Sequence, residues 1–322
     1  MLQNFADLED AAGSEAKLWL LIGKDFAMSL GSQFSGSRLG RYVSGFSMAL
    51  VLLFAIGYAL RGPTTAHAKD WSKLAIAGSL NFMPYAGRNA SGWPIGFDID
   101  VTNNLCARMR ATCTIEDHYP MSLATDLNAG KYDAVIGALS IPPKRSEEVD
   151  FSRAYALPPF TFAVQKNDPL ADMPSTRVSL DDVPATEAMV KELTPYLTGK
   201  KIGVRHWSVQ EDLLNTYFKG ITAQTRTTRE AILKVQTGQL DAALSFTSFF
   251  VSALAEPGGD RLTLAGPQMT GGPLGRGLGI ALRKTDPELK DRFDKAIREA
   301  QADGTLKRLS LKWFKTDISP PN

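Results

Sequence analysis

The stretch from residue 96 to residue 152 indicates most about the architecture of this protein. In chain order its segments read GFDID (96–100), GKYDAVI (130–136), SIPPKR (140–145) and DFS (150–152). The run DAVIGAL (133–139) predicts a buried strand, because it is short and almost continuously apolar. Arg145 follows this strand by a few residues. The stretch therefore places a lone arginine near a strand end, in a segment that is otherwise suited to folding and packing.

The same alternation continues through the rest of the chain. From Lys69 onward, short apolar stretches alternate with amphipathic helical stretches, a pattern typical of an α/β sheet. KLAIAG (73–78) predicts the first strand and residues 101–109 predict a helix. Asp98 or Asp100 is suited to cap that helix, because the free N–H groups of a helix start accept a carboxylate.

One pattern occurs twice, which indicates an internal duplication. KIGVRHW (201–207) repeats the character of the opening strand, and GQLDAAL (238–244) repeats GKYDAVI (130–136). Each GxxD-plus-apolar unit follows a predicted helix. Repetition of this kind predicts two similar lobes, each with its own sheet.

These segments, in this order and spacing, closely resemble the polar amino-acid-binding proteins of ABC importers. This solute-binding family 3 includes binders of lysine/arginine/ornithine, of histidine and of opines, and the resemblance covers nearly all of residues 70–316. It implies an α/β, two-lobed periplasmic-binding-protein fold (type II), each lobe a sheet flanked by helices, joined by a two-strand hinge.

The resemblance also implies where the lobes begin and end. Lobe I is expected to comprise residues 69–166 and 274–322, because the C-terminal helices of the family return to the first lobe. Lobe II is expected at 167–273. The crossing strands would be FTFAVQ (160–165) and LGIALR (278–283). Ligand would bind in the cleft between the lobes.

Arg145 is the strongest candidate for a ligand contact. A guanidinium in a closed cleft matches a carboxylate with two parallel hydrogen bonds, and in the relatives the arginine of this motif binds the α-carboxylate of the ligand. Spacing alone would favour a surface arginine in the Lys144–Arg145 pair, and the surrounding motif favours the ligand contact instead. In the family, residues at Gly137, Ala138 and Ser140 bind the amino and carboxylate ends. Only backbone contacts carry over to the first two, and Ser140 could be a plain strand-end hydroxyl.

Aromatic residues are expected to form one wall of the site. Phe82 and Tyr85 lie in the loop SLNFMPY (79–85), where the family has an aromatic ring that lies flat against the ligand side chain. Such a face suits an aliphatic stem or a cation, although core packing would explain both residues. Tyr119 lies in the region of a second family aromatic, but YPMS (119–122) departs from the usual sequence, and the alignment could slip by one.

Lobe II is expected to contribute a helix start. In RHWSVQE (205–211) the hydroxyl of Ser208 and the N–H of Val209 match positions that help bind the carboxylate in relatives. Arg205 and Trp207 are unusual for the family. They add a charge and a large ring beside the cleft, or they face solvent.

Departures from the family pattern bear on the ligand. Relatives that bind an α-amino group carry an acid just after the GxLDAAL strand, where this chain reads Ser245-Phe246-Thr247. Binders of basic ligands also have an acid at the position of Ser79. A buried ammonium without a counter-charge is costly, so a lysine- or arginine-like ligand is disfavoured. The site inventory is instead Arg145, Arg205 and several aromatic rings, with Phe246 among the candidate contacts, and it favours an organic anion, an apolar or aromatic amino acid, or an opine-like conjugate.

The two cysteines are seven positions apart. Cys106 is expected on the helix and Cys113 just beyond it, a separation that can be bridged once the chain turns and that an exporting compartment would oxidise. The relatives carry a disulfide at the same spacing. Two buried free thiols remain the alternative.

The N-terminal region has the features of a secretory signal peptide. Arg38 and Arg41 precede the apolar run 46–60, and Ala66-His67-Ala68 provides a small-x-small exit. We therefore expect an N-terminal extension plus signal peptide over 1–68, cleavage after Ala68 and a periplasmic location. An uncleaved anchor is the alternative. Residues 1–37 are long for a signal-peptide head and are explained if Met28 is the true start.

Composition and motifs exclude several function classes. The net charge of +2 and the absence of a Lys/Arg run argue against nucleic-acid binding. The three histidines are scattered and the cysteines lack metal spacing, so no metal or cofactor is expected. GRGLG (275–279) precedes a strand rather than a helix, which favours hinge glycines over a phosphate loop.

The sequence thus predicts a monomeric substrate-binding component of an ABC importer. It would capture an amino acid or related small carboxylate solute and deliver it to a membrane permease with its ATPase subunits, without catalysis. The same fold hosts enzymes, so a secreted cyclohexadienyl (prephenate or arogenate) dehydratase is the alternative, with His206 as a candidate acid/base. A sensor module of a membrane receptor is a third possibility.

Overall fold

The computed structural model describes residues 69–117 and 123–321 of the chain. The chain divides into two units, Met1–Lys69 and Asp70–Asn322, and every element below belongs to the second. The expected signal peptide, its cleavage site and Tyr119 lie outside the described residues. Among the described residues, no helix combines the length and apolar character needed to cross a membrane.

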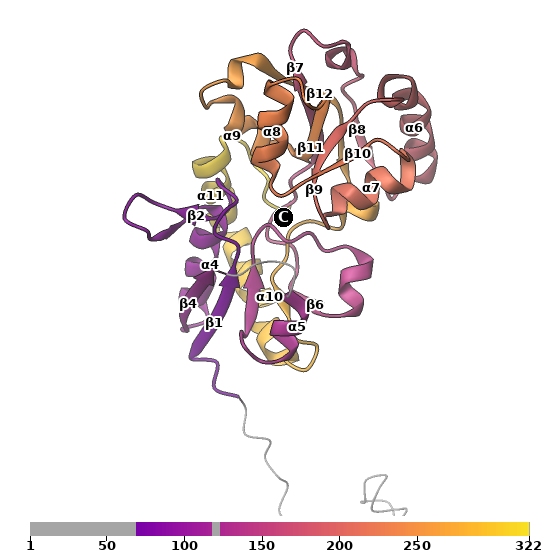
Figure 1. Cartoon of the computed structure of the whole chain (residues 1–322). Coiled ribbons are helices and arrows are strands. Elements are labelled where there is room, and N and C mark those ends of the chain that lie inside the picture. The colour runs from indigo at the N-terminus through magenta and orange to yellow at the C-terminus, as the bar shows by residue number, and fades with distance from the viewer. Residues whose placement is uncertain (1–68, 118–122, 322) are drawn as a thin grey trace, which may run out of the picture. The chain divides into compact units, whose positions relative to one another are not determined.

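The first sheet has five strands in the order β4-β1-β5-β13-β6 (Figure 1). β1 pairs in parallel with both β4 and β5, whereas β13 pairs antiparallel with β5 and β6. The inner strand β5 is buried throughout, which explains its continuous apolar sequence. The bounds are β1 (Lys73–Gly78), β4 (Thr112–Asp117), β5 (Ala134–Ile136), β6 (Asp150–Phe151) and β13 (Ala281–Leu282).

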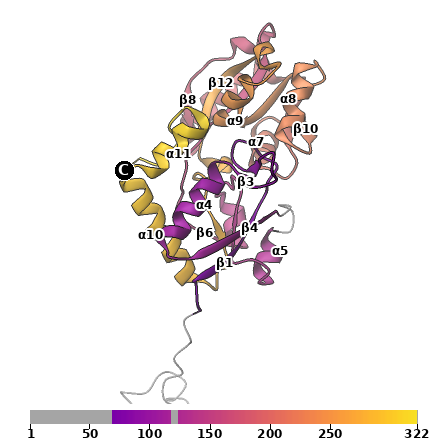
Figure 2. The same cartoon turned by 90° about the vertical axis from the view of Figure 1, so that its left-hand side faces the viewer.

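Helices from both ends of this unit pack beside the first sheet. Figure 2 shows α10 and α11 beside α4, and the three helices contact one another. The C-terminal helices therefore pack against the helix of the first lobe. The bounds are α4 (Phe97–Arg108), α5 (Leu123–Asn128), α10 (Pro287–Ala302) and α11 (Thr305–Phe314), and a small hairpin pairs β2 (Gly87–Arg88) with β3 (Pro94–Ile95).

Helix α4 begins earlier than the sequence indicated. Gly96 is its N-cap residue with φ 132°, and no side chain caps the helix. Asp98 and Asp100 therefore lie in the first turn, so the expected capping role for either is wrong. The reason is local geometry, because a Cβ at Gly96 would lie 2.2 Å from the carbonyl oxygen of Tyr85. Only glycine permits that close approach, and this sets the start of the helix.

The second sheet has six strands in the order β10-β9-β11-β7-β12-β8. Its strands are β7 (Phe160–Gln165), β8 (Arg177–Ser179), β9 (Ile202–Arg205), β10 (Thr222–Thr225), β11 (Ala242–Phe246) and β12 (Leu262–Thr270). The helices of this lobe are α6 (Val183–Leu197), α7 (Val209–Tyr217), α8 (Thr228–Gln236) and α9 (Thr247–Leu254). The short 3₁₀ helices of the unit are η2 (Pro143–Glu147), η3 (Pro169–Asp172), η4 (Gly259–Arg261) and η5 (Gly272–Leu274).

The crossing between lobes differs in detail from the expected one. β7 is an inner strand of the second sheet, antiparallel to β11 and β12, rather than a crossing strand of lobe I. Five of its six residues are buried, as is typical of an apolar strand in the interior of a covered sheet. Lobe II thus begins at residue 160 instead of 167. Two segments, 152–159 and 271–280, connect the sheets, and we call them the crossing segments.

The crossing segments pair with each other. Ala156 and Leu278 form an isolated antiparallel bridge. The N–H of Leu278 donates to the Ala156 carbonyl, and the N–H of Tyr155 donates to the Leu278 carbonyl, both at 2.8 Å. The glycine-rich run 275–279 lies in this pair, which agrees with the prediction of hinge glycines rather than a phosphate loop.

Candidate functional site

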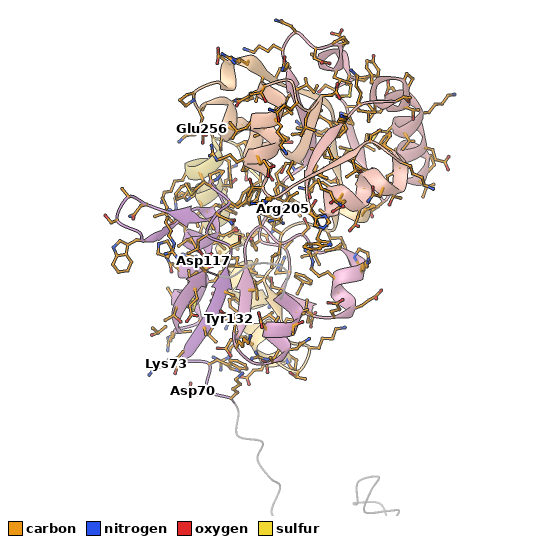
Figure 3. All side chains as sticks on the ribbon, in the orientation of Figure 1. Asp70, Lys73, Asp117, Tyr132, Arg205 and Glu256 are labelled. Atoms are coloured by element: carbon orange, nitrogen blue, oxygen red, sulfur yellow. A yellow bond between two sulfur atoms is a disulfide. The ribbon has the colours of Figure 1, made fainter. Side chains whose placement is uncertain are left out.

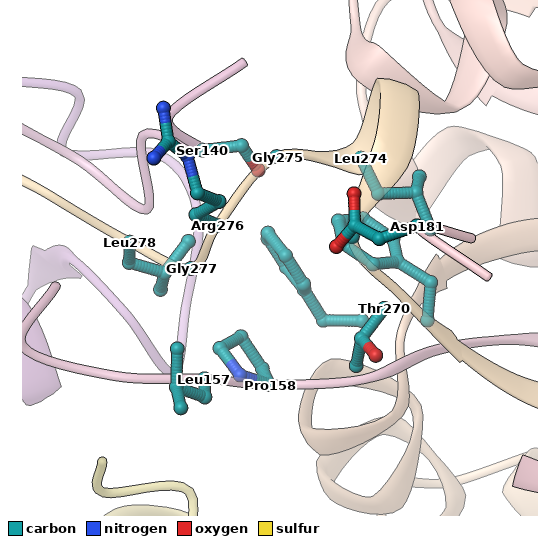
Figure 4. A pocket seen from close by; sticks show the side chains of 13 residues that line it. Ser140, Leu157, Pro158, Asp181, Thr270, Leu274, Gly275, Arg276, Gly277 and Leu278 are labelled. Carbon is teal, nitrogen blue, oxygen red and sulfur yellow. The ribbon is translucent and has the colours of Figure 1, made fainter. Parts of the chain in front are cut away.

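A cavity of about 230 Å³ lies between the two lobes beside the crossing segments (Figure 4). Its walls combine the loop after β5, both crossing segments, the starts or ends of β7, β11 and β12, and the loop after β8. The lining residues are Ser140, Leu157, Pro158, Phe160, Asp181, Phe246, Thr270, Gly271, Leu274, Gly275, Arg276, Gly277 and Leu278. Two residues predicted for the site, Ser140 and Phe246, are among them.

Arg145 lies next to this cavity on the 3₁₀ helix η2. It is half-buried, and its Nη1 donates a hydrogen bond to the Ser140 carbonyl at 3.0 Å. Burial lowers the pKa of the guanidinium, while the negative charges of Asp212 and Glu148 partly oppose that effect. Asp212 belongs to α7 of lobe II, so the cation of lobe I interacts electrostatically with the opposite lobe.

The loop after β5 is held by a buried carboxylate. Asp98 is 0% exposed; its Oδ2 accepts from the N–H of Ala138 at 2.7 Å and its Oδ1 from the Tyr155 hydroxyl at 2.9 Å. Burial raises the pKa of Asp98 to about 7, although these two hydrogen bonds lower it. Ala138 has φ 49° and Gly137 φ 152°. The N–H of Ala138 is thus engaged within lobe I, which removes it from the expected backbone contacts to a ligand.

Two of the predicted aromatic residues bridge the lobes. Phe82 stacks between Tyr85, with ring centroids 5.4 Å apart, and Phe249 of α9, at 4.9 Å. Tyr85 is fully buried, and its hydroxyl lies 2.6 Å from Oγ of Ser248, also on α9. Its ring also contacts Phe97, Phe246 and Phe314. Tyr85 therefore packs in the core of this structure, whereas Phe82 is half-buried between the lobes.

Arg205 and Phe246 approach this aromatic cluster from lobe II. The Cζ atom of Arg205, at the end of β9, lies 5.9 Å from the centroid of the Phe82 ring, within cation–π distance. Figure 3 labels Arg205 where lobe II faces lobe I. Phe246 is buried, with its ring centroid 4.4 Å from that of Phe160. The arrangement places a cation, rather than an acid, beside Phe82.

The hydroxyl of Ser208 caps the N-terminus of α7. Oγ of Ser208 accepts from the N–H of Glu211 at 3.3 Å, so this side chain completes the helix N-terminus. Trp207 before it has φ 54° and is 59% exposed. Of the two positions that the sequence left open for this ring, beside the cleft or facing solvent, the structure shows the second. Val209 is the first helical residue, and its contact to ligand stays a prediction.

The remaining predicted residues have local partners. The hydroxyl of Ser79 donates to Oδ1 of Asn81 at 2.9 Å. Nδ1 of His206 lies 3.3 Å from Oε2 of Glu211. Cys106 and Cys113 form the predicted disulfide. Within the described ranges, no group of three or more His, Cys, Asp or Glu side chains is arranged to hold a metal ion.

Several lining residues were missed by the sequence interpretation. The cavity wall also contains Asp181 in the loop after β8, Thr270 at the end of β12 and Arg276 in the second crossing segment. The glycine run 275–279 was a signal for the position of Arg276. Asp181 gave no such signal, because its place at the cavity depends on the pairing of β8 with β12.

Comparisons with known proteins point to one family of bacterial binding proteins. The family model described as bacterial extracellular solute-binding proteins, family 3, matches residues 74–316. The octopine-binding periplasmic protein of Rhizobium meliloti is 30% identical over 292 residues, which cover 84% of this chain and 98% of the relative. The histidine-binding periplasmic protein of Salmonella typhimurium is 31% identical over 277 residues, covering 84% and 96%.

A solved structure agrees with this assignment. The periplasmic His/Glu/Gln/Arg/opine family-binding protein from Silicibacter pomeroyi, in complex with lysine, superimposes with a TM-score of 0.62. It is 26% identical and covers 77% of this chain and 100% of that chain. The two-lobed fold, the match over residues 74–316 and the identity to periplasmic relatives show that this chain is a periplasmic member of family 3 of the bacterial extracellular solute-binding proteins.

Proposed function

We propose that the protein captures a small carboxylate-bearing solute, an amino acid or a related compound, between its two lobes and delivers it to an ABC permease with ATPase subunits. The observation that carries this proposal is the position of Arg145, half-buried and hydrogen-bonded to Ser140 at the edge of the interlobe cavity. A guanidinium in that position is suited to bind a carboxylate through two parallel hydrogen bonds.

The site would be completed by residues from both lobes. Ser140 and Phe82 would contribute from lobe I, and Phe246, Arg205 and the helix start at 208–209 from lobe II. Because a solute that touches both lobes stabilises the closed arrangement over the open one, binding drives closure. The closed form then presents both lobes to the permease, and we expect the protein to act as a monomer.

The relatives support this class of solute. Their names record binding of octopine and of histidine, both of which carry a carboxylate. Those relatives are binding proteins rather than enzymes, and we infer that this chain also binds its solute without turnover. The histidine nearest the start of α7, His206, has its Nδ1 3.3 Å from Oε2 of Glu211, and the same oxygen accepts a hydrogen bond from the N–H of Trp207.

A thermal-shift screen tests the proposal. Protein purified from the periplasm after expression of the full chain would be screened against amino acids, opines, organic acids and cyclohexadienyl acids. A solute that binds only folded protein increases the free energy of unfolding, by about 2.7 kcal/mol at a solute concentration of a hundred times Kd. The melting temperature rises as a result. We expect a shift with one class and recovery of the solute unchanged. No shift in any class would contradict the proposal, and conversion of a cyclohexadienyl acid would indicate the dehydratase instead.

A further inference from the structure

A C-terminal tail, residues 315–321, follows helix α11 and turns back onto the protein. The helix ends at Phe314, and Lys315 after it has φ 59°, a left-handed conformation that directs the chain out of the helix. Ile318 in the tail is 4% exposed and belongs to the main hydrophobic core. The tail is therefore anchored by a buried side chain of its own.

One buried hydroxyl holds the tail against the helix. Oγ of Ser310, on α11, donates to the Thr316 carbonyl at 2.7 Å and accepts from the N–H of Ile318 at 2.8 Å. Ser310 is 0% exposed. Because a buried polar group that loses its partner destabilises the folded protein, this pair of bonds fixes the course of the tail.

The tail is hydrogen-bonded to the first crossing segment. The N–H of Leu157 donates to the Ile318 carbonyl at 2.7 Å. One residue earlier, Ala156 pairs with Leu278 of the second crossing segment. The tail therefore adds a third segment to the crossing pair, and it binds the last backbone N–H before β7 of lobe II begins.

Two prolines separate this bond from the first bond to lobe II. Pro158 and Pro159 follow Leu157, and Figure 4 shows Leu157 and Pro158 next to each other on this segment. The Pro159 carbonyl accepts from the N–H of Thr247, at the start of α9, at 2.8 Å. The segment thus passes from a bond within lobe I to a bond with lobe II across two residues whose rings fix φ and which have no N–H.

The second crossing segment has the backbone freedom that the first one lacks. Gly271 and Gly275, on either side of the 3₁₀ helix η5, have φ of 75° and 83°, a region that glycine adopts readily. The N–H of Arg276 then donates to the Ile141 carbonyl of lobe I at 3.2 Å. Both glycines therefore lie between the end of β12 in lobe II and the first bond to lobe I.

We propose that the C-terminal tail is a strap on the hinge, which restrains how far the lobes separate. A hinge works through a few residues that absorb changes in φ and ψ. While the tail holds Leu157, residues up to 157 move with lobe I, and bending of the first crossing segment is confined to the two prolines. Once the tail is released, residues 156–157 also turn, and the lobes sample wider openings.

This inference rests on the proposed function, which requires the lobes to open and close, and it adds a regulatory element to that function. The apparent affinity for a solute falls with the fraction of molecules in the arrangement that can bind it. By narrowing the range of openings, the strap keeps a larger fraction of the protein close to the arrangement that closes on the solute.

Distances between the lobes test the strap without any solute. A chain that ends at Lys315 lacks the bond to Leu157, whereas a chain that ends at Ser319 keeps Ile318 and is the matched control. Spin labels would be attached to p-acetylphenylalanine introduced at Glu147 of η2 and Thr216 of α7, both exposed, which leaves the disulfide intact. In pulsed electron paramagnetic resonance, we expect a longer mean distance and a broader distribution for the chain that ends at Lys315. The full chain and the control should give the same narrower distribution.

A point variant tests the strap in a chain of full length. Ser310→Ala removes both bonds that hold the tail to α11 and should lengthen and broaden the distances in the same direction. Ser319→Ala is its control, because that hydroxyl bonds to Asp317 within the tail, and it should match wild type. The inference is overturned if Ser310→Ala keeps the wild-type distribution, or if the chain that ends at Ser319 broadens as much as the chain that ends at Lys315. In either case, a solute found by thermal shift would still support the proposed function, because that screen uses the intact tail.

Discussion

At the scale of single residues, burial acts on two charges of the site in different ways. Arg145 is half-buried and stays a cation, with its pKa lowered by burial. Asp98 is completely buried, and its pKa is raised to about 7 mainly by desolvation. The first residue is the proposed partner of the solute carboxylate, whereas the second holds the loop after β5 and the first crossing segment together.

Replacing Arg145 should weaken solute binding. Arg145→Ala removes the partner of the solute carboxylate, which costs about 2–5 kcal/mol for a desolvated charge pair, roughly 30-fold or more in Kd. Calorimetry with the solute found by screening measures the change. Lys144→Ala is the control, because Lys144 is exposed on the same 3₁₀ helix. Equal affinities of wild type and Arg145→Ala would exclude Arg145 from the site.

Asp98 should make stability depend on pH. Its folded-state pKa lies above the ordinary value of 3.8, so the folded protein binds the proton more tightly than the unfolded chain. The stabilisation is complete below about pH 4 and is lost as the pH rises toward 7, with a slope of at most about 1.36 kcal/mol per pH unit.

Urea unfolding at pH 5 and pH 7.5 measures this effect. We expect the free energy of unfolding of wild type to fall relative to that of Asp98→Asn over this range, because the amide does not ionise. Glu116→Gln, an exposed change on β4, should keep the pH dependence of wild type. Parallel pH profiles for wild type and Asp98→Asn would refute the effect.

At the scale of elements, the disulfide ties the helix that begins at Phe97 to the strand that follows it. Cys106 lies on α4 and Cys113 on β4, with a sequence separation of 7. β4 is an edge strand of the first sheet, and among the described strands its partner is β1. The bond therefore holds an edge element to the core helix beside it.

Loss of the disulfide should lower stability. A closed loop of about eight residues corresponds to roughly 2.5 kcal/mol in the chain-entropy treatment, so we expect reductant to lower the melting temperature of wild type. The double variant Cys106→Ala/Cys113→Ala should melt at the lower temperature with or without reductant. A wild-type melting temperature that reductant leaves unchanged would show that the bond adds nothing to stability.

At the scale of the whole lobed unit, the two crossing segments determine how the lobes are joined. Gly277 has φ 103°, and a Cβ there would lie 2.7 Å from the carbonyl oxygen of Ala156 and 2.4 Å from Cδ2 of Leu157. Both atoms belong to the facing crossing segment. The absence of a side chain at Gly277 is what lets the two segments pair closely.

Gly277→Ala should therefore destabilise the protein more than an ordinary glycine replacement. Gly220 also has positive φ, 82°, but a Cβ there meets nothing within 4 Å, so Gly220→Ala reports the backbone cost alone, roughly 1–2 kcal/mol. We expect Gly277→Ala to cost about 1–3 kcal/mol more, because of overpacking against the facing segment. Equal unfolding free energies for the two variants in urea titrations would contradict close pairing.

Local sequence patterns were sufficient to predict the fold class and the family. Strand and helix periodicities, the repeated GxxD unit and the motifs from GFDID to DFS are local patterns, and local patterns can be read without knowing what lies across the sheet. The same reasoning, together with the disulfide spacing of the family that the chain resembles, predicted the disulfide, because the turn expected between Cys106 and Cys113 brings the two residues close. It also placed Ser140 and Phe246 at strand ends that line the cavity.

Tertiary structure alone decided which residues meet. The assignment of 160–165 to the second sheet depends on β11 and β12 as neighbours, and strand order is a nonlocal property. Tyr85 became a core residue because α11 and α9 approach it. Asp181 reached the cavity because β8 aligns with β12, and the two residues that this pairing joins are about ninety positions apart in the chain. Contacts over such separations leave no local trace, so the full set of residues that line the cavity emerged only from the folded molecule.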